Sequence, residues 1–216
     1  AFYYTVFSPD LQVFFMKKRA DFAKSALRKG RFFFPPELLN FINKKLRLQR
    51  SYGIMKQGIY PKIIRGQIMY KFILSTDSTC DLYADFVKEN DIRFVSLNFV
   101  FEENGQFTEG VDAFTDYSQY VDFYNRLRGG AFSRTSMLNY ESHYNHFLTL
   151  AKEGAKDVLH FTISSGLSPP VTVAQKAAAD IKKDYPDFNL LAVDSLSATI
   201  GQGALVRAAL RLRNEG

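Results

Sequence analysis

From residue 69 to the end of the chain, apolar and polar positions alternate in short, regular blocks. Strands are predicted at 71–76, 157–163 and 189–193, and 91–101 is strand-rich because Val95, Leu97 and Phe99 alternate with Ser96 and Asn98. Helices are predicted at 82–89, 116–127, 139–152, 169–183 and 199–213. Strands that alternate with helices in this way favour an α/β fold, a mainly parallel sheet with helices on both faces.

The ends of these blocks carry turn and cap signals. Asn139 stands where a helix N-cap is expected, since its short polar side chain can bind free backbone N–H groups. Gly129-Gly130 and Gly154 follow two of the predicted helices, as glycine often does at a helix C-terminus. Glu102–Gly105 is predicted to be a turn.

Residues 1–68 show no such order. They carry 14 Lys and Arg against 3 Asp and Glu, whereas 69–216 carries 14 against 19, so the formal charge of +6 describes neither part. A basic helix at 17–31 and a short amphipathic helix at 37–48 are the only elements expected there. Three interpretations stay open for this basic, Phe-rich segment: an accessory arm, a tail that binds an anionic surface, or sequence upstream of a true start at Met69.

Cysteine content and hydropathy limit the compartment. A single cysteine, Cys80, excludes an intramolecular disulfide framework and is typical of a reducing environment. No uncharged apolar run approaches the roughly 18 residues of a membrane span. The apolar opening AFYYTVFSPDLQVFFM precedes its basic cluster, the reverse of a secretory signal. A cytoplasmic protein without stable membrane insertion is expected.

Hydroxyl and carboxyl side chains recur where the predicted strands end. The pairs are Asp77-Ser78, Ser164-Ser165 and Asp194-Ser195, and Thr135-Ser136 stands between two predicted helices. Since the carboxyl ends of parallel strands share one edge of a sheet, we expect these side chains to converge on a ligand site there. The helix N-termini at that edge favour an anionic group on the ligand. The simpler interpretation of each pair is a helix N-cap, which does not exclude ligand binding.

Most familiar catalytic and cofactor motifs are missing from the sequence. It contains neither G-x-G-x-x-G nor G-x-x-x-x-G-K-[ST], so no nucleotide cofactor is predicted, and the glycines of Gly201-Gln202-Gly203 are expected to permit close helix packing. Ser165 lies outside a G-x-S-x-G elbow. His143 and His146 are spaced for a shared metal but are expected to form a solvated helix face, with His160 a satisfied strand residue.

Two further features have a structural and a functional interpretation. Cys80 is expected to be a small packed side chain rather than a thiolate activated at a helix N-terminus. An aromatic series spaced mostly three to four residues apart is expected to belong to the core, although a long apolar ligand would also need such a lining. Its members are Phe114, Tyr117, Tyr120, Phe123 and Tyr124.

The segment 69–216 resembles the DegV family of bacterial fatty-acid-binding proteins. The resemblance rests on motifs in matching order: STDSTCDL, IRFVSLNFVF, EGVD, RTS at 134–136, ISSGLS at 163–168 and VDSLSATIGQG at 193–203. It implies a protein that holds one long-chain fatty acid and presents its carboxylate to a separate ATP-dependent fatty-acid kinase. It also implies that the carboxylate is bound by hydroxyls of Thr135, Ser136, Ser164 and Ser165.

The sequence departs from the family in two places. Leu167-Ser168 runs into Pro169-Pro170, where the family usually continues with glycine, threonine and tyrosine, so one anion contact is expected to be lost. The resemblance implies a second domain that closes the tunnel, and this sequence ends at Gly216, before the position expected for that domain. Two other functions stay open: an α/β hydrolase or phosphotransferase that uses Ser165 or Asp77 on a small anionic substrate, and binding of nucleic acid or anionic membrane by residues 1–68.

Overall fold

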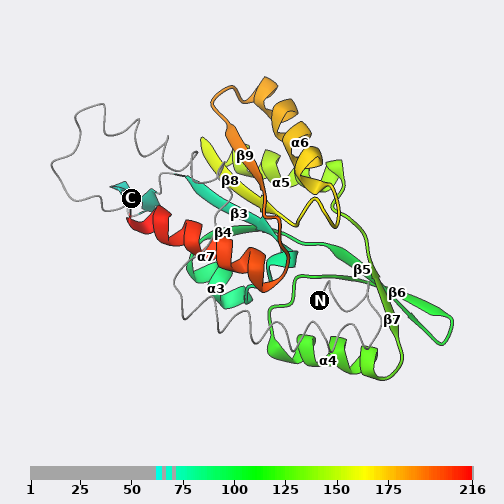
Figure 1. Ribbon diagram of the computed structural model, residues 1–216. Coiled ribbons are helices and arrows are strands. Elements are labelled where there is room, and N and C mark those ends of the chain that lie inside the picture. The colour runs from blue at the N-terminus through cyan, green and yellow to red at the C-terminus, as the bar shows by residue number, and fades with distance from the viewer. Residues whose placement is uncertain (1–61, 65–66, 70–71, 216) are drawn as a thin grey trace. The chain divides into compact units, whose positions relative to one another are not determined.

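The computed structural model describes residues 62–64, 67–69 and 72–215, which all belong to one unit spanning Tyr60–Gly216 (Figure 1). The helices expected at 17–31 and 37–48 lie outside these residues. The strands are β1 (Lys62–Ile64), β2 (Gln67–Met69), β3 (Ile73–Asp77), β4 (Ile92–Val95), β5 (Asn98–Glu103), β6 (Gln106–Val111), β7 (Phe132–Thr135), β8 (Asp157–Thr162) and β9 (Asn189–Asp194). The helices are the 3-10 turn η2 (Ser78–Cys80), α3 (Ala84–Glu89), α4 (Tyr117–Arg128), α5 (Tyr140–Lys152), α6 (Pro170–Asp184) and α7 (Ile200–Glu215).

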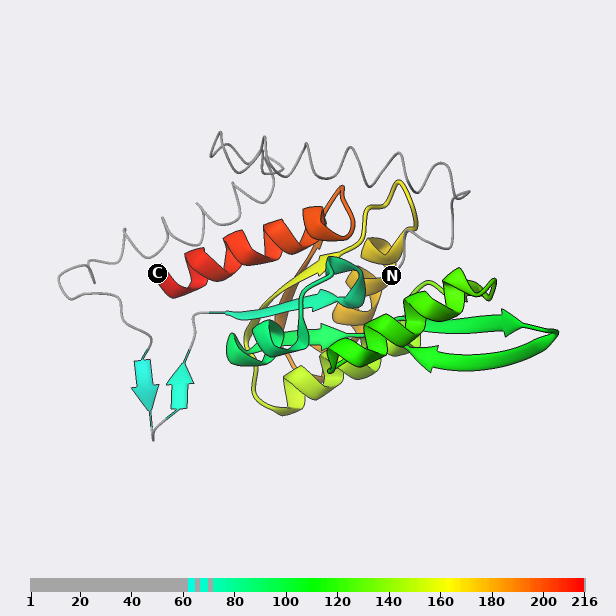
Figure 2. The ribbon, with the colours of Figure 1, turned by 90° about the horizontal axis from the view of Figure 1, so that it is seen from below.

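A four-stranded parallel sheet in the order β4-β3-β8-β9 forms the centre of the fold. Helix α7 covers one of its faces, and α5 and α6 cover the other (Figure 2). The apolar runs of β3 and β8 are buried on both faces, as expected for inner strands of a parallel sheet. The predicted α/β class and the helices on both faces are therefore confirmed.

The main apolar core of this sheet lies between the strands and the pair α5–α6. It contains Phe147, Leu150, Ala174, Ala177 and Ile181, all buried, with Phe188 and Ala192 near β9. The alanines of α6 let α5 and α6 approach closely, since small side chains shorten the distance between packed helices. This packing fixes β8 and β9, whose carboxyl ends carry two of the predicted site pairs.

The strand-rich stretch 91–101 forms two strands in two different sheets. After β4, the backbone N–H of Leu97 donates to the Ser78 hydroxyl (3.0 Å) rather than to a neighbouring strand. From Asn98 onward, β5 pairs with β6 and β7 in an antiparallel sheet of order β6-β5-β7. The alternation of apolar and polar residues across 91–101 does indicate strand, but its two halves belong to two separate sheets.

Strands β6 and β7 were not predicted from the sequence. Every residue of β6 except Gly110 is exposed, so apolar and polar positions hardly alternate along this strand. Glu109, Gly110 and Val111 of the EGVD motif form the end of this strand. A Cβ atom on Gly110 would lie 2.3 Å from the Phe99 ring, so glycine is needed for the ring to lie across the strand.

Helix α4 covers one face of the antiparallel sheet, and its bounds lie within one residue of the predicted 116–127. Asp116 caps it by accepting from the Ser118 N–H, and Gly129 is its C-cap. Phe123 of α4 packs on Phe99 and Phe101 of β5 in a small separate core.

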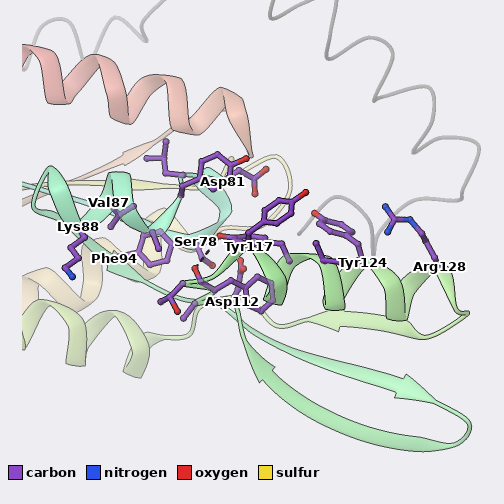
Figure 3. Close-up of a pocket in the computed structure, with 17 residues that line it drawn as sticks. Ser78, Asp81, Val87, Lys88, Phe94, Asp112, Tyr117, Tyr124 and Arg128 are labelled. Atoms are coloured by element: carbon purple, nitrogen blue, oxygen red, sulfur yellow. Dashed lines mark hydrogen bonds between the residues drawn. The ribbon is translucent and has the colours of Figure 1, made fainter.

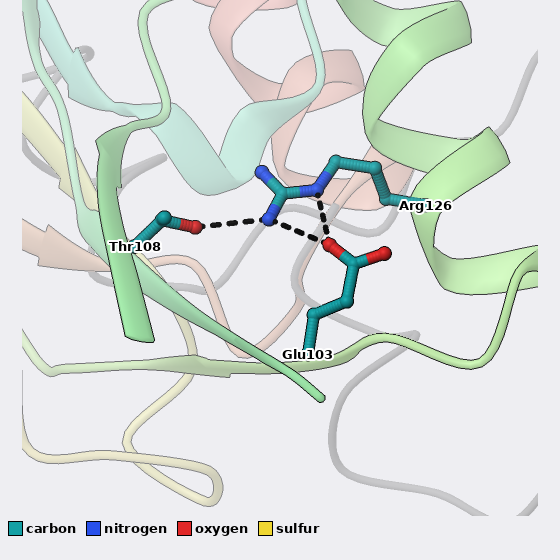
Figure 4. Close-up of polar contacts among 3 residues, drawn as sticks. All are labelled: Glu103, Thr108 and Arg126. Carbon is teal, nitrogen blue, oxygen red and sulfur yellow. Dashed lines mark hydrogen bonds and ion pairs between the residues drawn. The ribbon is translucent and has the colours of Figure 1, made fainter. Parts of the chain in front are cut away.

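Arg126 connects α4 to the β5–β6 hairpin through hydrogen bonds and an ion pair (Figure 4). Its guanidinium stacks on the Phe101 ring at 4.0 Å and donates to the carboxylate of Glu103 at 3.1 Å. The same group donates to the Thr108 hydroxyl at 2.9 Å, which ties the helix to both strands.

Strands β1 and β2 form an antiparallel hairpin that the sequence analysis did not predict. Met69 lies in β2 and pairs with Lys62. The predicted domain boundary at residue 69 therefore falls within a paired strand, and it stays a prediction.

Candidate functional site

The Asp77 side chain organises the edge of the sheet where β3 ends. Its carboxylate is almost fully buried and accepts from the Ile163 N–H at 3.0 Å, the Thr79 N–H at 3.1 Å and the Gln202 amide at 2.9 Å. Burial raises the pKa of Asp77, and the hydrogen bonds from Thr79, Gln202 and Ile163 oppose that shift. Because Ile163 precedes Ser164, this contact joins the ends of β3 and β8.

Gln202 of α7 completes this network, and sequence reasoning missed it. Its side chain is fully buried; the amide N–H₂ also donates to the Thr76 hydroxyl, and the amide oxygen accepts from the Thr79 hydroxyl. The glycine on its C-terminal side makes this possible, since a Cβ on Gly203 would lie 2.5 Å from the Cys80 carbonyl. Close packing at Gly201-Gln202-Gly203 is confirmed.

Ser78 links the end of β3 to the antiparallel sheet. Its hydroxyl accepts from the Leu97 N–H, and the next residue, Asn98, accepts at its carbonyl from the Ser136 N–H (3.3 Å). Thr135 pairs with Phe99 in the β5–β7 ladder. Thr135 and Ser136 are therefore held next to the ends of β3 and β4, although they are far away in sequence.

The ends of β8 and β9 are joined in the same way. The Asp194 carboxylate accepts from the Ser165 N–H at 3.1 Å, and the Ser164 N–H donates to the Ser197 carbonyl at 2.8 Å. The Ser195 hydroxyl donates to that same Ser197 carbonyl, so it caps its own loop. Hydrogen bonds thus connect all four predicted pairs along one edge of the molecule.

The eight predicted site residues fall into two groups: those whose side chains already hold loops together, and those whose hydroxyls can still donate to a ligand. The side chains of Asp77, Ser78, Asp194 and Ser195 hold loops together through the contacts above. The Ser164 hydroxyl accepts from the Gly166 N–H and keeps its own proton to donate. The hydroxyls of Thr135, Ser136 and Ser165 make no hydrogen bond to any described residue.

A pocket of about 570 Å³ lies beside this edge, between η2, α3, β4 and α4 (Figure 3). Ser78 belongs to its wall, so the pocket begins where β3 ends. The rest of the wall is mainly apolar or aromatic, with Leu82, Tyr83, Ala84, Val87, Phe94, Phe114, Tyr117, Tyr120, Val121 and Tyr124. Its volume is within the range of small-molecule sites, and its lining suits an apolar ligand.

The aromatic series from Phe114 to Tyr124, most of it on α4, serves two purposes. Phe123 is buried in the core, as expected, whereas Phe114, Tyr117, Tyr120 and Tyr124 line the pocket. Phe114 and Tyr120 meet edge to face at 5.0 Å, which fixes the shape of the wall. Phe114 and Tyr124 also pack against the Phe123 core, so the core expectation is confirmed for three members of the series and wrong for Tyr117 and Tyr120.

Asp112 brings a carboxyl group to the same wall. Burial raises its pKa, and a hydrogen bond with Ser78 opposes that shift. Lys88 and Arg128 also belong to the lining, on α3 and α4 respectively. The pocket is thus apolar along its length with a few polar groups, and Ser78 connects it to the strand ends.

The expectation for Cys80 is confirmed. It is fully buried and its pKa is raised to about 12, mainly by burial, so its thiol is not an activated nucleophile.

The expectation for the histidine pair is wrong. His143 is fully buried and His146 half-buried, and both face the sheet instead of solvent. Within the described residues, no three His, Cys, Asp or Glu side chains are arranged to hold a metal ion. None of the described helices is long and apolar enough to cross a bilayer.

Comparisons with known proteins agree on one family. A family model described as an uncharacterised protein of the DegV family matches residues 71–216. A DegV domain-containing protein of Clostridium perfringens is 32% identical over 148 residues, which cover 68% of this chain and 49% of the relative. A DegV domain-containing protein of Streptococcus pyogenes is 30% identical over 145 residues, with 67% and 49% coverage.

Solved structures show the same similarity. A stearic-acid-binding protein of Eubacterium ventriosum matches with a TM-score of 0.55 and 27% identity, over 67% of this chain and 48% of that one. A Thermotoga maritima protein, whose structure was solved as revealing a fatty acid binding function, matches with a TM-score of 0.56 and 26% identity, over 68% and 50%. The chain spans about half the length of the relatives it matches.

Proposed function

Because the chain belongs to the DegV family, we propose that it binds one long-chain fatty acid and acts as a carrier rather than an enzyme. The acyl chain lies in the pocket between α3 and α4, and the carboxylate is bound by the hydroxyls of Thr135, Ser136, Ser164 and Ser165. The observation that carries this proposal is that hydrogen bonds connect the loops bearing these hydroxyls to Ser78, a residue of the pocket wall. The four hydroxyl residues themselves are not part of that wall.

The two parts of the site have different energetic roles. Burying a chain of methylene groups stabilises the complex by about 0.8 kcal/mol for each CH₂, so the pocket supplies most of the affinity. A carboxylate loses its hydration on binding, and hydroxyl donors replace it. The hydroxyls therefore fix the orientation of the ligand. The proposal assigns Asp77, Ser78, Asp194 and Ser195 to holding these donor loops in place.

The enzyme interpretation has little support from the geometry. The carboxylate of Asp77 is buried and already accepts several hydrogen bonds, so it is not poised as a base. The three histidines of the chain lie together between the sheet and α5, where two of them contact the Ser75 hydroxyl. None of them is a base for Ser165.

The resemblance to the DegV family supports one further proposal: a separate kinase acts on the bound carboxylate. A carboxylate held at the sheet edge by hydroxyls, with the acyl chain in the pocket, leaves its oxygens directed away from the pocket. That arrangement suits transfer of a phosphoryl group from a partner. Binding of nucleic acid or membrane by residues 1–68 stays a separate prediction, tested by whether salt-dependent binding disappears when 1–68 is deleted.

The test is the affinity of the delipidated chain for palmitate, measured by displacement of a fluorescent fatty acid. Replacing both serines (Ser164→Ala with Ser165→Ala) should weaken binding about 10-fold to 100-fold, because several donors to a charged group are lost. Thr149→Val, which removes an exposed hydroxyl of α5 outside the site, should leave the affinity unchanged. Equal affinity of the double variant and the wild type would contradict the assigned carboxylate site.

A further inference from the structure

The three histidines of the chain form one cluster between the parallel sheet and α5. His143 and His146 come from α5, and His160 comes from β8. The ring centroid of His160 lies 5.5 Å from that of His143 and 6.0 Å from that of His146. The Ser75 hydroxyl of β3 joins two of the rings, at 2.8 Å from His146 Nε2 and 2.8 Å from His160 Nδ1.

The hydrogen bonds of this cluster fit neutral rings. A hydroxyl donates only one hydrogen bond, so one of the two rings accepts from Ser75 and the other donates to it. Neither ring nitrogen of His143, nor Nε2 of His160, has a partner within the described part of the chain. Burial lowers the pKa of His143 and of His146 to about 4, and it lowers that of His160 well below its usual value. An added proton would leave a buried charge with no acceptor.

The other groups around the cluster do not compensate such a charge. The positive charge of Arg93 on β4 disfavours a proton on His146, and Arg93 itself forms an ion pair with Glu153, the residue after α5. Helix α6 packs behind α5 through alanines, and the partner of His160 on β9 is Ala192. No described carboxylate appears among the groups that influence the three rings. A positive charge there is therefore uncompensated.

Each element that contributes to the cluster lies close in sequence to a residue that binds the carboxylate or holds its loops in place. Ser75 stands two residues before Asp77 on β3, and His160 stands four residues before Ser164 on β8. Helix α5 begins four residues after Ser136. The histidine cluster is thus the place where β3, β8 and α5 pack together.

We propose that His143, His146 and His160 are positioning residues for the carboxylate site, and that protonating them loosens α5 from the sheet and releases the ligand. The donor loops then no longer converge, because Thr135-Ser136 separates from Ser164-Ser165. This inference rests on the proposed function and adds its regulation, an acid-sensitive release of bound fatty acid.

The test compares the palmitate affinity of the wild type and of His143→Leu between about pH 7.5 and pH 5. Each ring that must stay neutral for binding weakens the wild-type affinity by up to about 30-fold at pH 5, if its pKa returns to normal on release. His143→Leu removes one titrating ring without removing a hydrogen bond, so its affinity should fall less steeply. Comparison at the same pH cancels the titration of palmitate itself.

A second variant and a control make the result decisive. His146→Gln keeps a polar group near Ser75 without a titratable ring, so it should also flatten the profile, and it decides the question if His143→Leu does not fold. Glu141→Gln, on an exposed position of the same helix, should keep the wild-type profile. Binding at neutral pH with identical profiles for the wild type and both histidine variants would overturn the inference. No binding at any pH would instead overturn the proposed function.

Discussion

Asp77 shows how a single side chain supports the proposed site without touching a ligand. Its oxygens accept from Thr79 of η2, from Ile163 directly after β8 and from Gln202 of α7, three groups that are far apart in sequence. Backbone N–H groups that lose a buried acceptor are costly because no water replaces it. The carboxyl is therefore expected to determine stability more than any other polar side chain at this edge.

Asp77→Ala should lower the free energy of unfolding by about 3–5 kcal/mol, since it leaves several buried donors without an acceptor. Urea unfolding followed by circular dichroism measures this loss. Asp122→Ala, on the exposed side of α4, is the matched control and should change stability by less than about 0.5 kcal/mol. A loss below 1 kcal/mol for Asp77→Ala would mean that other acceptors replace the carboxyl.

Cys80 should be unreactive in the folded protein. It is fully buried and its pKa is about 12, so both access and thiolate formation are suppressed at pH 8. A disulfide reagent such as Ellman's reagent should label it slowly in buffer and completely in denaturant. Fast labelling of the native protein would show that η2 opens readily.

The recurrence of hydroxyl and carboxyl residues after β3, β8 and β9 could be found in the sequence, because parallel strands share one edge. Which of these residues hold the loops and which keep free donors could not, since that depends on partners such as Ser197 and Leu97. Gln202 gave only an indirect signal, the glycines on either side of it. The histidine cluster was misjudged because helical spacing does not show which side of α5 faces the sheet.

The contact of α7 with η2 depends on a glycine. Gly203→Ala places a Cβ against the backbone carbonyl of Cys80, which cannot yield as a side chain would. We expect a loss of about 1–3 kcal/mol in thermal or urea unfolding, although alanine is the better helix former. Gly129→Ala, where the nearest atoms lie 3.4 Å away, is the matched control and should be nearly neutral. If both variants behave alike, α7 and η2 are less tightly packed than described.

The junction of α4 with the β5–β6 hairpin depends on Arg126. Arg126→Ala should cost about 1 kcal/mol, because its ion pair is more than one third exposed and screened by solvent, and the stacking on Phe101 adds a modest amount. Arg126→Lys should recover only part of this, since lysine lacks the planar fork. Equal stability of all three proteins in urea unfolding would show that α4 is held by its apolar face alone.

Helices and inner strands were predicted well because their patterns are strong. The cap at Asn139 gave the start of α5 to the residue, and α4 begins one residue after its predicted start. Strands β6 and β7 were missed because an exposed edge strand and a four-residue strand bury few side chains, and pairing with β5 rather than sequence determines them. The division of 91–101 depends on one tertiary contact, that of Leu97 with Ser78.

Taken as a unit, residues 72–215 combine a parallel sheet that presents hydroxyls with a smaller α4-covered sheet that helps to form an apolar pocket. The family model covers this same part of the chain, and the solved relatives that it resembles bind fatty acids. The chain spans about half of their length, so its own capacity to hold a lipid is the central question.

Native mass spectrometry of the delipidated 216-residue chain, incubated with excess palmitate, answers that question most directly. Our account predicts one bound palmitate for each chain, and loss of that complex in Ala84→Trp, which fills the pocket from α3. Ala179→Trp, on the exposed side of α6, should still bind one molecule. A folded wild-type chain that stays empty, or an Ala84→Trp variant that binds as the wild type does, would contradict the account.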